Sequence, residues 1–340
     1  MEKIIVLGGK GGVGKSSISA ATAILLSDLL PNKKILLISF DMAHNLSDLF
    51  KMKIGSKITP LTKNLWGIEP DADSYAEKYT KGLIEKMKTL TKQMPLVGMI
   101  PQIEKFIDTT FTADSIPLAL KNAMFFQKIL DAEDAGNQDI QYDIIVADFP
   151  PTANMITLFE IPEDQVKVVL KYSLNFYNSI KGAIRNISRV WRNLIKPFDN
   201  YEERRELGKE IFNMIVELEK RGERISELIH NKGSLRLVTI AEKPSFEEIK
   251  RARDLTERYI KLQGVHINMI IPEPEKCDFC AKLRSQQLKY TSEITKEFKK
   301  LKIWQSEKLR EEPIGLDGLR ALAYEIYADG TSDEILNPKP

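Results

Sequence analysis

A glycine-rich segment near the N-terminus has the residue types and the spacing needed to bind a polyphosphate. Residues 9–16 read G-K-G-G-V-G-K-S, which matches the pattern G-x-x-x-x-G-K-[ST]. Glycines let successive backbone N–H groups point at phosphate oxygens, and the N-terminus of a following helix adds a positive dipole end. Lys15 would then reach the β- and γ-phosphates, and the Ser16 hydroxyl would bind Mg²⁺. The residues expected to contact the nucleotide are Gly9, Gly11, Gly12, Val13, Gly14, Lys15, Ser16 and Ser17.

A dinucleotide-binding fold would use the same glycines differently, as G-x-G-x-x-G. That fold has an acidic residue about 20 positions further on, which binds a ribose. Here Asp41 ends the next apolar run, 27 positions after Gly14, and the pair Lys15-Ser16 would have no role on a nicotinamide cofactor. A glycine-rich turn without a ligand would not require the lysine, the serine and the flanking elements together. The spacing therefore favours a site for a nucleoside triphosphate with Mg²⁺.

Two aspartates follow short apolar runs and are candidates for the remaining chemistry. Asp41 follows residues 35–40, and Asp148 follows residues 142–147. Such runs are typical of interior parallel strands covered on both faces, and open α/β sheets bind ligands at the carboxyl ends of these strands. We expect Asp148 to hold Mg²⁺ together with Ser16, and Asp41 to align and activate the attacking water. A helix N-cap or a turn is the alternative role for either aspartate.

These side chains need a strand before the glycine-rich segment and a helix after it. The apolar run 4–7 predicts a buried strand, and residues 16–30 have apolar residues at helical spacing. With the later apolar runs, this predicts an α/β fold: a doubly wound, mostly parallel sheet that forms a P-loop NTPase core with an inserted α-helical subdomain. The expected parts are a discontinuous core at 1–70, 142–165 and 233–330, a helical subdomain at 71–141 and 166–232, and a flexible tail at 331–340.

Composition and simple motifs argue against several other classes of protein. The chain has 340 residues, and 50 basic against 48 acidic residues leave a net charge of +2, without the positive surplus that nucleic-acid binding needs. No run approaches the roughly 18 apolar residues of a membrane span, and the N-terminus reads as a strand rather than a signal peptide. Neither H-E-x-x-H nor G-x-S-x-G occurs. We expect a cytoplasmic protein with no nucleic-acid partner.

The glycine-rich segment contains an additional lysine, Lys10. In this it resembles the deviant Walker A motif of the dimeric ATPases that include MinD, ParA and nitrogenase iron protein. Residues 41–50, D-M-A-H-N-L-S-D-L-F, resemble the switch I segment D-P-A-H-N-L-S-D-x-F of the arsenite-pump and tail-anchored-protein-targeting ATPase family. Met42 takes the place of the family's proline. The resemblance extends over nearly the whole chain.

Two further segments resemble the same family less closely. Residues 148–154 are similar to its switch II segment D-T-A-P-T-G-H, with Ala153 and Asn154 in place of glycine and histidine. Asn268 lies where the family's V-N-Q motif has an asparagine that reads adenine, and Met269 replaces the glutamine. The resemblance thus implies that Asn268 contacts the base of ATP.

The resemblance also implies how such a protein works. It implies a homodimer in which ATP brings the two P-loop faces together and Lys10 reaches the phosphates bound by the partner subunit. In the targeting branch of the family, the helical subdomains form a composite groove for a transmembrane segment. The apolar stretches near 94–107 and 174–198 are our candidates for that groove, although such stripes belong to a core more often than to a groove.

The chain contains one pair of cysteines, Cys277 and Cys280, in a C-x-x-C motif. This spacing suits Zn²⁺, which takes four ligands in a structural site. Because no second pair exists, the simplest complete site is a four-thiolate zinc shared across a two-fold dimer. His266 is a weaker nitrogen candidate, and a redox pair or two ordinary thiols are the alternatives. The resemblance agrees, because the targeting branch has its zinc motif at this position.

These observations predict a homodimeric, Mg²⁺-dependent ATPase with ATP, Mg²⁺ and Zn²⁺ as cofactors. The expected function is to capture the transmembrane helices of tail-anchored membrane proteins and deliver them to a membrane receptor of unknown identity, with transient membrane association. The alternative is an arsenite-stimulated subunit of an arsenical efflux pump, a role that needs several thiolates at a metalloid site. A ParA- or MinD-like positioning switch would need a basic patch or an amphipathic C-terminus, and neither is visible.

Overall fold

The computed structural model describes residues 1–41, 45–70, 129–132, 140–152, 155, 220, 223–273 and 276–340. The chain divides into two compact units. The first comprises Met1–Asp71, Gln127–Phe159 and Ser226–Pro340, and the second comprises Ala72–Phe126 and Glu160–Ile225. Nearly all of the second unit, including the groove candidates near 94–107 and 174–198, lies outside the described residues. The account below therefore concerns the first unit.

An eight-stranded sheet forms the centre of the first unit, in the order β3-β4-β2-β5-β1-β6-β7-β8. Every neighbouring pair is parallel except β3 and β4, which are antiparallel. This confirms the predicted doubly wound, mostly parallel α/β fold. The strands are β1 (Lys3–Gly9), β2 (Ile35–Ser39), β3 (Thr59–Pro60), β4 (Leu65–Ile68), β5 (Ile144–Asp148), β6 (Gly233–Ile240), β7 (Leu262–Ile270) and β8 (Lys302–Glu307).

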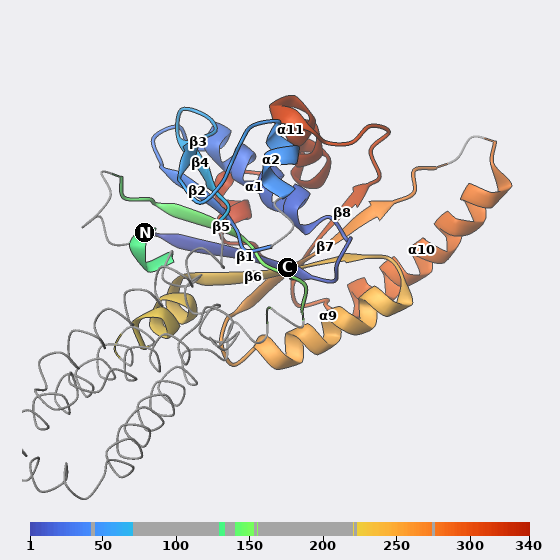
Figure 1. Ribbon diagram of the computed structural model, residues 1–340. Helices are drawn as coiled ribbons and strands as arrows, with labels where there is room; N and C mark the ends of the chain where they lie inside the picture. Colours follow the sequence, from blue (N-terminus) through green and yellow to red (C-terminus); the bar gives the residue numbers. More distant parts are fainter. Residues whose placement is uncertain are drawn as a thin grey trace, which may run out of the picture. The chain divides into compact units, whose positions relative to one another are not determined.

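Helices cover both faces of this sheet (Figure 1). On one face lie α1, α2 and α11, and on the other lie α9 and α10. Among the described residues, no helix combines the length and apolar composition that crossing a bilayer requires. The helices are α1 (Lys15–Leu29), α2 (Asn45–Phe50), α9 (Lys243–Thr256), α10 (Asp278–Glu297), α11 (Gly315–Tyr327) and α12 (Ser332–Leu336).

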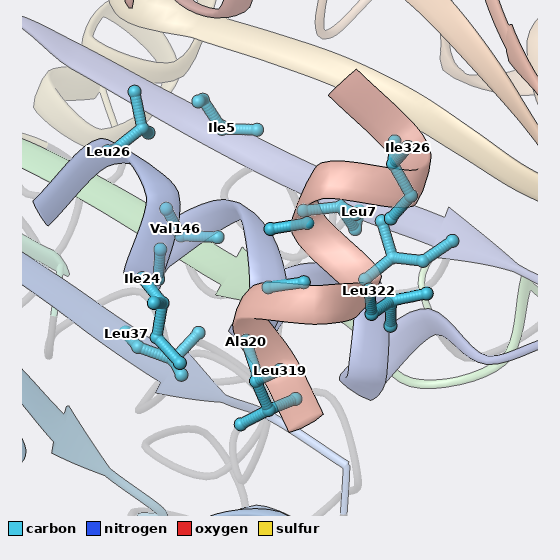
Figure 2. Close-up of a cluster of buried hydrophobic side chains, with 14 of the residues drawn as sticks. Ile5, Leu7, Ala20, Ile24, Leu26, Leu37, Val146, Leu319, Leu322 and Ile326 are labelled. Carbon is cyan, nitrogen blue, oxygen red and sulfur yellow. The ribbon is translucent and has the colours of Figure 1, made fainter. Parts of the chain in front are cut away.

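A hydrophobic cluster between the sheet and the helices α1 and α11 fixes the start of α1 (Figure 2). Ile5 and Leu7 of β1 belong to this cluster, while Ile4 and Val6 are buried outside it. Successive side chains of a strand point to opposite faces, so β1 is buried on both sides, as its unbroken apolar run predicts. This packing fixes the position of the first turn of α1 relative to the end of β1. The loop that joins them is the glycine-rich segment.

A polar and aromatic group is also buried on this side of the sheet. Arg236 of β6 is fully buried, and its guanidinium lies 5.0 Å from the centre of the Trp304 ring. It donates hydrogen bonds to the Tyr327 hydroxyl at 3.3 Å and to the backbone carbonyl of Ile335. The Tyr327 hydroxyl is in turn 2.7 Å from that of Thr22 on α1. Burial removes water from the Arg236 guanidinium and thereby lowers its pKa. The two oxygen acceptors replace part of that lost hydration.

The C-terminal segment 331–340, which we expected to be a flexible tail, differs from that expectation. Residues Ser332–Leu336 form helix α12, and Thr331 and Glu334 form a capping box at its N-terminus. Ile335 is 1% exposed, and its carbonyl accepts the hydrogen bond from Arg236. The polar composition concealed a T-x-x-E signal for a helix start. One apolar side chain and one buried cation attach the segment to the core.

We predict that this attachment contributes to stability. A chain ending at Gly330 loses the buried Ile335 side chain and leaves Arg236 without one acceptor, so its unfolding free energy should fall by about 3–5 kcal/mol. A chain ending at Asn337 keeps both contacts and is the matched control. Urea unfolding of the two chains checks the prediction, and equal midpoints would show that α12 contributes nothing.

Candidate active site

The glycine-rich loop leaves β1 and enters α1 through backbone conformations that favour glycine. Gly12 has φ of 79° and Gly14, the N-cap of α1, has φ of 89°. A Cβ atom at Gly14 would lie 2.4 Å from the side-chain nitrogen of Asn268, so a larger residue would displace the loop. The loop is therefore shaped to expose its backbone N–H groups at the start of a helix.

Lys15, the lysine expected at the β- and γ-phosphates, folds back over this loop. Its side-chain nitrogen donates a hydrogen bond to the backbone carbonyl of Lys10 at 3.1 Å, and the residue is only 4% exposed. Lys10 is half-buried. The structure thus places Lys15 at the phosphate-binding loop, while the action of Lys10 on a partner subunit stays a prediction.

Asp148 lies at the end of β5 and is fully buried. Burial raises its pKa to about 6, and hydrogen bonds from Ser16 and Ser39 and the positive charge of Lys15 lower it in part. The Ser39 hydroxyl donates to one carboxylate oxygen at 3.1 Å. A carboxylate beside the Ser16 hydroxyl is the donor set that Mg²⁺ prefers, so these two residues fit the predicted role in binding the metal ion.

Asp41 follows β2 and Asp148 ends β5, and these two strands are neighbours in the sheet. Ser39 of β2 is in register with Asp148 of β5, and the N–H of Phe40 donates to the carbonyl of Asp148 at 2.8 Å. The N–H of Asp41 donates to the Ser39 hydroxyl at 3.3 Å. Because Ser39 bonds to both, it ties the two aspartates to one edge of the sheet. Met42, Ala153 and Asn154, the departures from the family's switch motifs, lie outside the described residues.

A cavity of about 450 Å³ opens above this edge. This is the size of a small-molecule site, and the glycine-rich loop and Asp41 both line it. Glu312, Pro313 and Ile314 also line the cavity, and they were not predicted because no local pattern in the sequence marks them. The residues lining the cavity are Gly11, Gly12, Gly14, Lys15, Ser16, Ser17, Asp41, Asp48, Leu49, Met269, Glu312, Pro313 and Ile314.

Asn268 supports the loop from within the fold. It is 4% exposed, its amide donates to the carbonyl of Val13 at 3.0 Å, and its amide oxygen accepts from the Ser306 hydroxyl at 2.8 Å. Its neighbour Met269, with φ of 57°, lines the cavity instead. Contact between Asn268 and adenine stays a prediction. Val13 and Asn268 are both buried, and neither is among the residues that line the cavity.

Cys277 and Cys280 begin α10. Cys277 is exposed, and its sulfur accepts a hydrogen bond from the N–H of Cys280 at 3.3 Å. This contact lowers the pKa of Cys277, while the thiol contact with Cys277 raises the pKa of Cys280. His266 is buried, and its ring stacks on that of Trp304 with 4.5 Å between the ring centres, so it is not available as a metal ligand beside Cys277 and Cys280. Within the described ranges, no three His, Cys, Asp or Glu residues are grouped to hold a metal ion.

A glycine-rich loop between the first strand and a helix, with an aspartate at the end of the adjacent strand of a parallel sheet, defines the class of P-loop nucleoside triphosphatases. The loop amides and Lys15 can bind phosphate oxygens, and Ser16 with Asp148 can hold Mg²⁺. A bound Mg²⁺ would neutralise charge that develops on the phosphates. Asp41 projects from the strand edge into the same cavity, where an attacking water would lie.

Within this class, the chain belongs to the Anion-transporting ATPase family, which it matches over residues 2–328. The resemblance inferred from the switch I segment is thereby confirmed at the level of the family. The protein is an ATPase, and Mg²⁺ dependence follows from the general chemistry of the class.

Its relatives have two kinds of name. The chain is 26% identical to a putative arsenical pump-driving ATPase of Prosthecochloris vibrioformis, over 99% of this chain and 78% of the relative. It is 27% identical to putative arsenical pump-driving ATPase 2 of Aquifex aeolicus, over 94% and 97%. It is also 26% identical to an ATPase ASNA1 homolog of Entamoeba dispar, over 86% and 84%. Because the identity to relatives of either name is 26–27%, sequence identity does not decide between the two kinds of name.

We predict that Asp148→Asn stabilises the protein while it stops hydrolysis. Because the folded state raises the pKa of Asp148 from 3.8 to about 6, the folded protein binds this proton more tightly than the unfolded chain, and its unfolding free energy falls as pH rises between those values. The variant avoids this cost, so its advantage should grow with pH to at most about 3 kcal/mol above pH 6. Mg²⁺-dependent hydrolysis should be lost because a ligand is missing.

Urea unfolding between pH 4 and pH 8, with ATP turnover measured in parallel, checks both parts. Asp329→Asn, which removes an exposed carboxylate, is the control and should show neither effect. A variant less stable than the unmodified protein at pH 8 would contradict the argument from desolvation.

Proposed function

We propose that this ATPase is a homodimer that captures the transmembrane segment of tail-anchored membrane proteins and delivers it to a membrane. The observation that carries this proposal is the C-x-x-C pair at the start of α10, where Cys277 is exposed and Cys280 is partly exposed. Two thiolates are half of a tetrahedral zinc site, and a two-fold axis would supply the other half. Such a pair at this position is what the resemblance to the targeting branch implies.

In this proposal the nucleotide controls the dimer. ATP and Mg²⁺ bind through the glycine-rich loop, Ser16 and Asp148, and Lys10 reaches the phosphates of the partner subunit. Closure arranges the two helical subdomains as one groove, and hydrolysis assisted by Asp41 reopens it. The protein works in the cytoplasm and meets the membrane only transiently, through a receptor whose identity is open.

The second candidate is an arsenite-stimulated subunit of an arsenical efflux pump. Relatives named arsenical pump-driving ATPase support it. A metalloid site, however, needs several soft thiolates close together, and this chain has only the two cysteines of one C-x-x-C motif. Because a zinc clasp would already use both, we prefer the targeting function.

We predict that the Asp41→Asn protein holds a client stably. This change should spare ATP binding and nearly stop hydrolysis, so the closed state persists. Co-expression with a reporter that ends in one C-terminal transmembrane helix should give a complex that purifies without detergent.

A reporter without the helix should not co-purify, and Asp41→Asn combined with Lys15→Ala should lose the complex because the loop no longer binds the phosphates. Helix-independent capture would contradict the proposal. No capture, together with ATP turnover that rises on arsenite, would favour the pump.

We predict a shared zinc ion at the dimer axis. Metal analysis of the purified protein should find about half a zinc per chain, because four thiolates from two chains complete one site. Cys277→Ser with Cys280→Ser should remove the zinc and weaken the dimer, while ATP binding by the monomer is retained. A full zinc per chain, or none, would contradict the shared site.

A further inference from the structure

A buried glutamate connects the end of β4 to the beginning of α2. Glu69 directly follows β4 and is 1% exposed. One of its carboxylate oxygens accepts the backbone N–H of Leu46 at 2.7 Å, and the other accepts the Ser47 hydroxyl at 3.1 Å. A helix leaves its first N–H groups without partners, and a buried carboxylate is tolerated only where such donors reach it. Glu69 therefore caps α2 from a different part of the chain.

Through Ser47, the same carboxylate is also connected to the turn after α2. The Ser47 oxygen accepts the N–H of Ile54 at 3.0 Å and lies 2.9 Å from the carbonyl of Ile54. The N–H of Glu69 donates to the carbonyl of Gly55 at 3.0 Å. The segment from α2 to Gly55 is thus attached to Glu69 at both of its ends, through side chain and backbone. If α2 moves, these hydrogen bonds must either break or move Glu69 with the helix.

The other side of α2 belongs to the nucleotide cavity. Asp48 and Leu49 line the cavity, and Asp41, the candidate for activating the attacking water, precedes α2 in the chain. Glu69 itself is 1% exposed and is not among the residues that line the cavity. It lies two residues before Asp71, the point at which the chain leaves the first compact unit. The Glu69 carboxylate thus connects α2 to the part of the chain that leads into the second unit.

We propose that Glu69 is a positioning residue for hydrolysis, which couples α2 to the chain that enters the second unit. Holding α2 sets where Asp48 and Leu49 stand at the cavity and limits how far Asp41, four residues before α2 in the chain, can move. A shift of α2 on hydrolysis reaches the insertion through Glu69 and Pro70. The role in positioning rests on ATP hydrolysis alone, while its use to reset the client groove rests on the function proposed above.

Glu69→Ala removes both hydrogen bonds and tests the proposal. Because the glycine-rich loop is untouched, the dissociation constant for ATP should change by less than about threefold, while kcat should fall by about 10- to 100-fold from misplacement of Asp41. Glu69→Gln keeps the shape and a carbonyl oxygen for the Leu46 N–H, so it should restore most of kcat. Ser47→Ala should reproduce part of the loss.

A loss of stability alone could also slow an enzyme, so Ile335→Ala serves as the matched control. It removes a buried side chain of α12, remote from the cavity, and should lower the unfolding midpoint without the selective loss of kcat. Proportional loss of ATP binding and kcat in Glu69→Ala, or an unchanged kcat, would overturn the role in positioning.

Hydrogen exchange tests the coupling. ATP should change the exchange of backbone amides in the second unit of the unmodified protein, and Glu69→Ala should abolish that change while the amides of the glycine-rich loop still respond. If the second unit responds equally in both, the coupling is overturned. If kcat and exchange behave as expected but no client is captured, Glu69 keeps its role and only the proposed function fails.

Discussion

The buried carboxylate of Asp148 is the constraint on which the nucleotide site depends. An ionised group without water costs free energy unless donors and positive charges surround it, and the sheet edge provides Ser16, Ser39 and Lys15 for that purpose. The partners come from the start of α1 and from β2, so one carboxylate at the end of β5 brings three elements together. The raised pKa reflects the desolvation that remains, and a Mg²⁺ ion bound beside the carboxylate would lower that pKa.

Packing around β1 gives this electrostatic arrangement its precision. Ile5 and Leu7 hold α1 against the sheet from one side, and Asn268 holds the loop at Val13 from the other. The space at Gly14 is already filled by the Asn268 amide, so loop and support fit only when the loop residue has no side chain. Hydrophobic burial supplies the stability, while a few directional hydrogen bonds decide the geometry.

The parts of this structure that were predictable from the sequence are those with a local signal. The unbroken apolar run of β1 and the glycine spacing after it are sufficient to predict a strand, a phosphate-binding loop and a helix, and the fold confirms the parallel sheet. Glu312 and Pro313 at the cavity, by contrast, approach it only through the tertiary path of the chain, and no pattern marks them. Helix α12 did have a signal, the capping pair Thr331 and Glu334, but its hydrogen bond to the core comes from Arg236, which is distant in sequence.

Buried polar residues at the two margins of the cavity have related roles. Asn268 connects β7 and β8 to the phosphate-binding loop, and Glu69 connects the end of β4 to α2. Each is nearly inaccessible and each satisfies backbone groups that would otherwise be costly to bury. The loop side is also held by the hydrophobic packing between β1 and α1. On the α2 side, Leu46, Phe50 and Ile54 belong to the same hydrophobic cluster, and the Glu69 carboxylate sets the direction of the backbone there. Each wall of the cavity thus combines hydrophobic packing with one buried polar residue that orients a backbone segment.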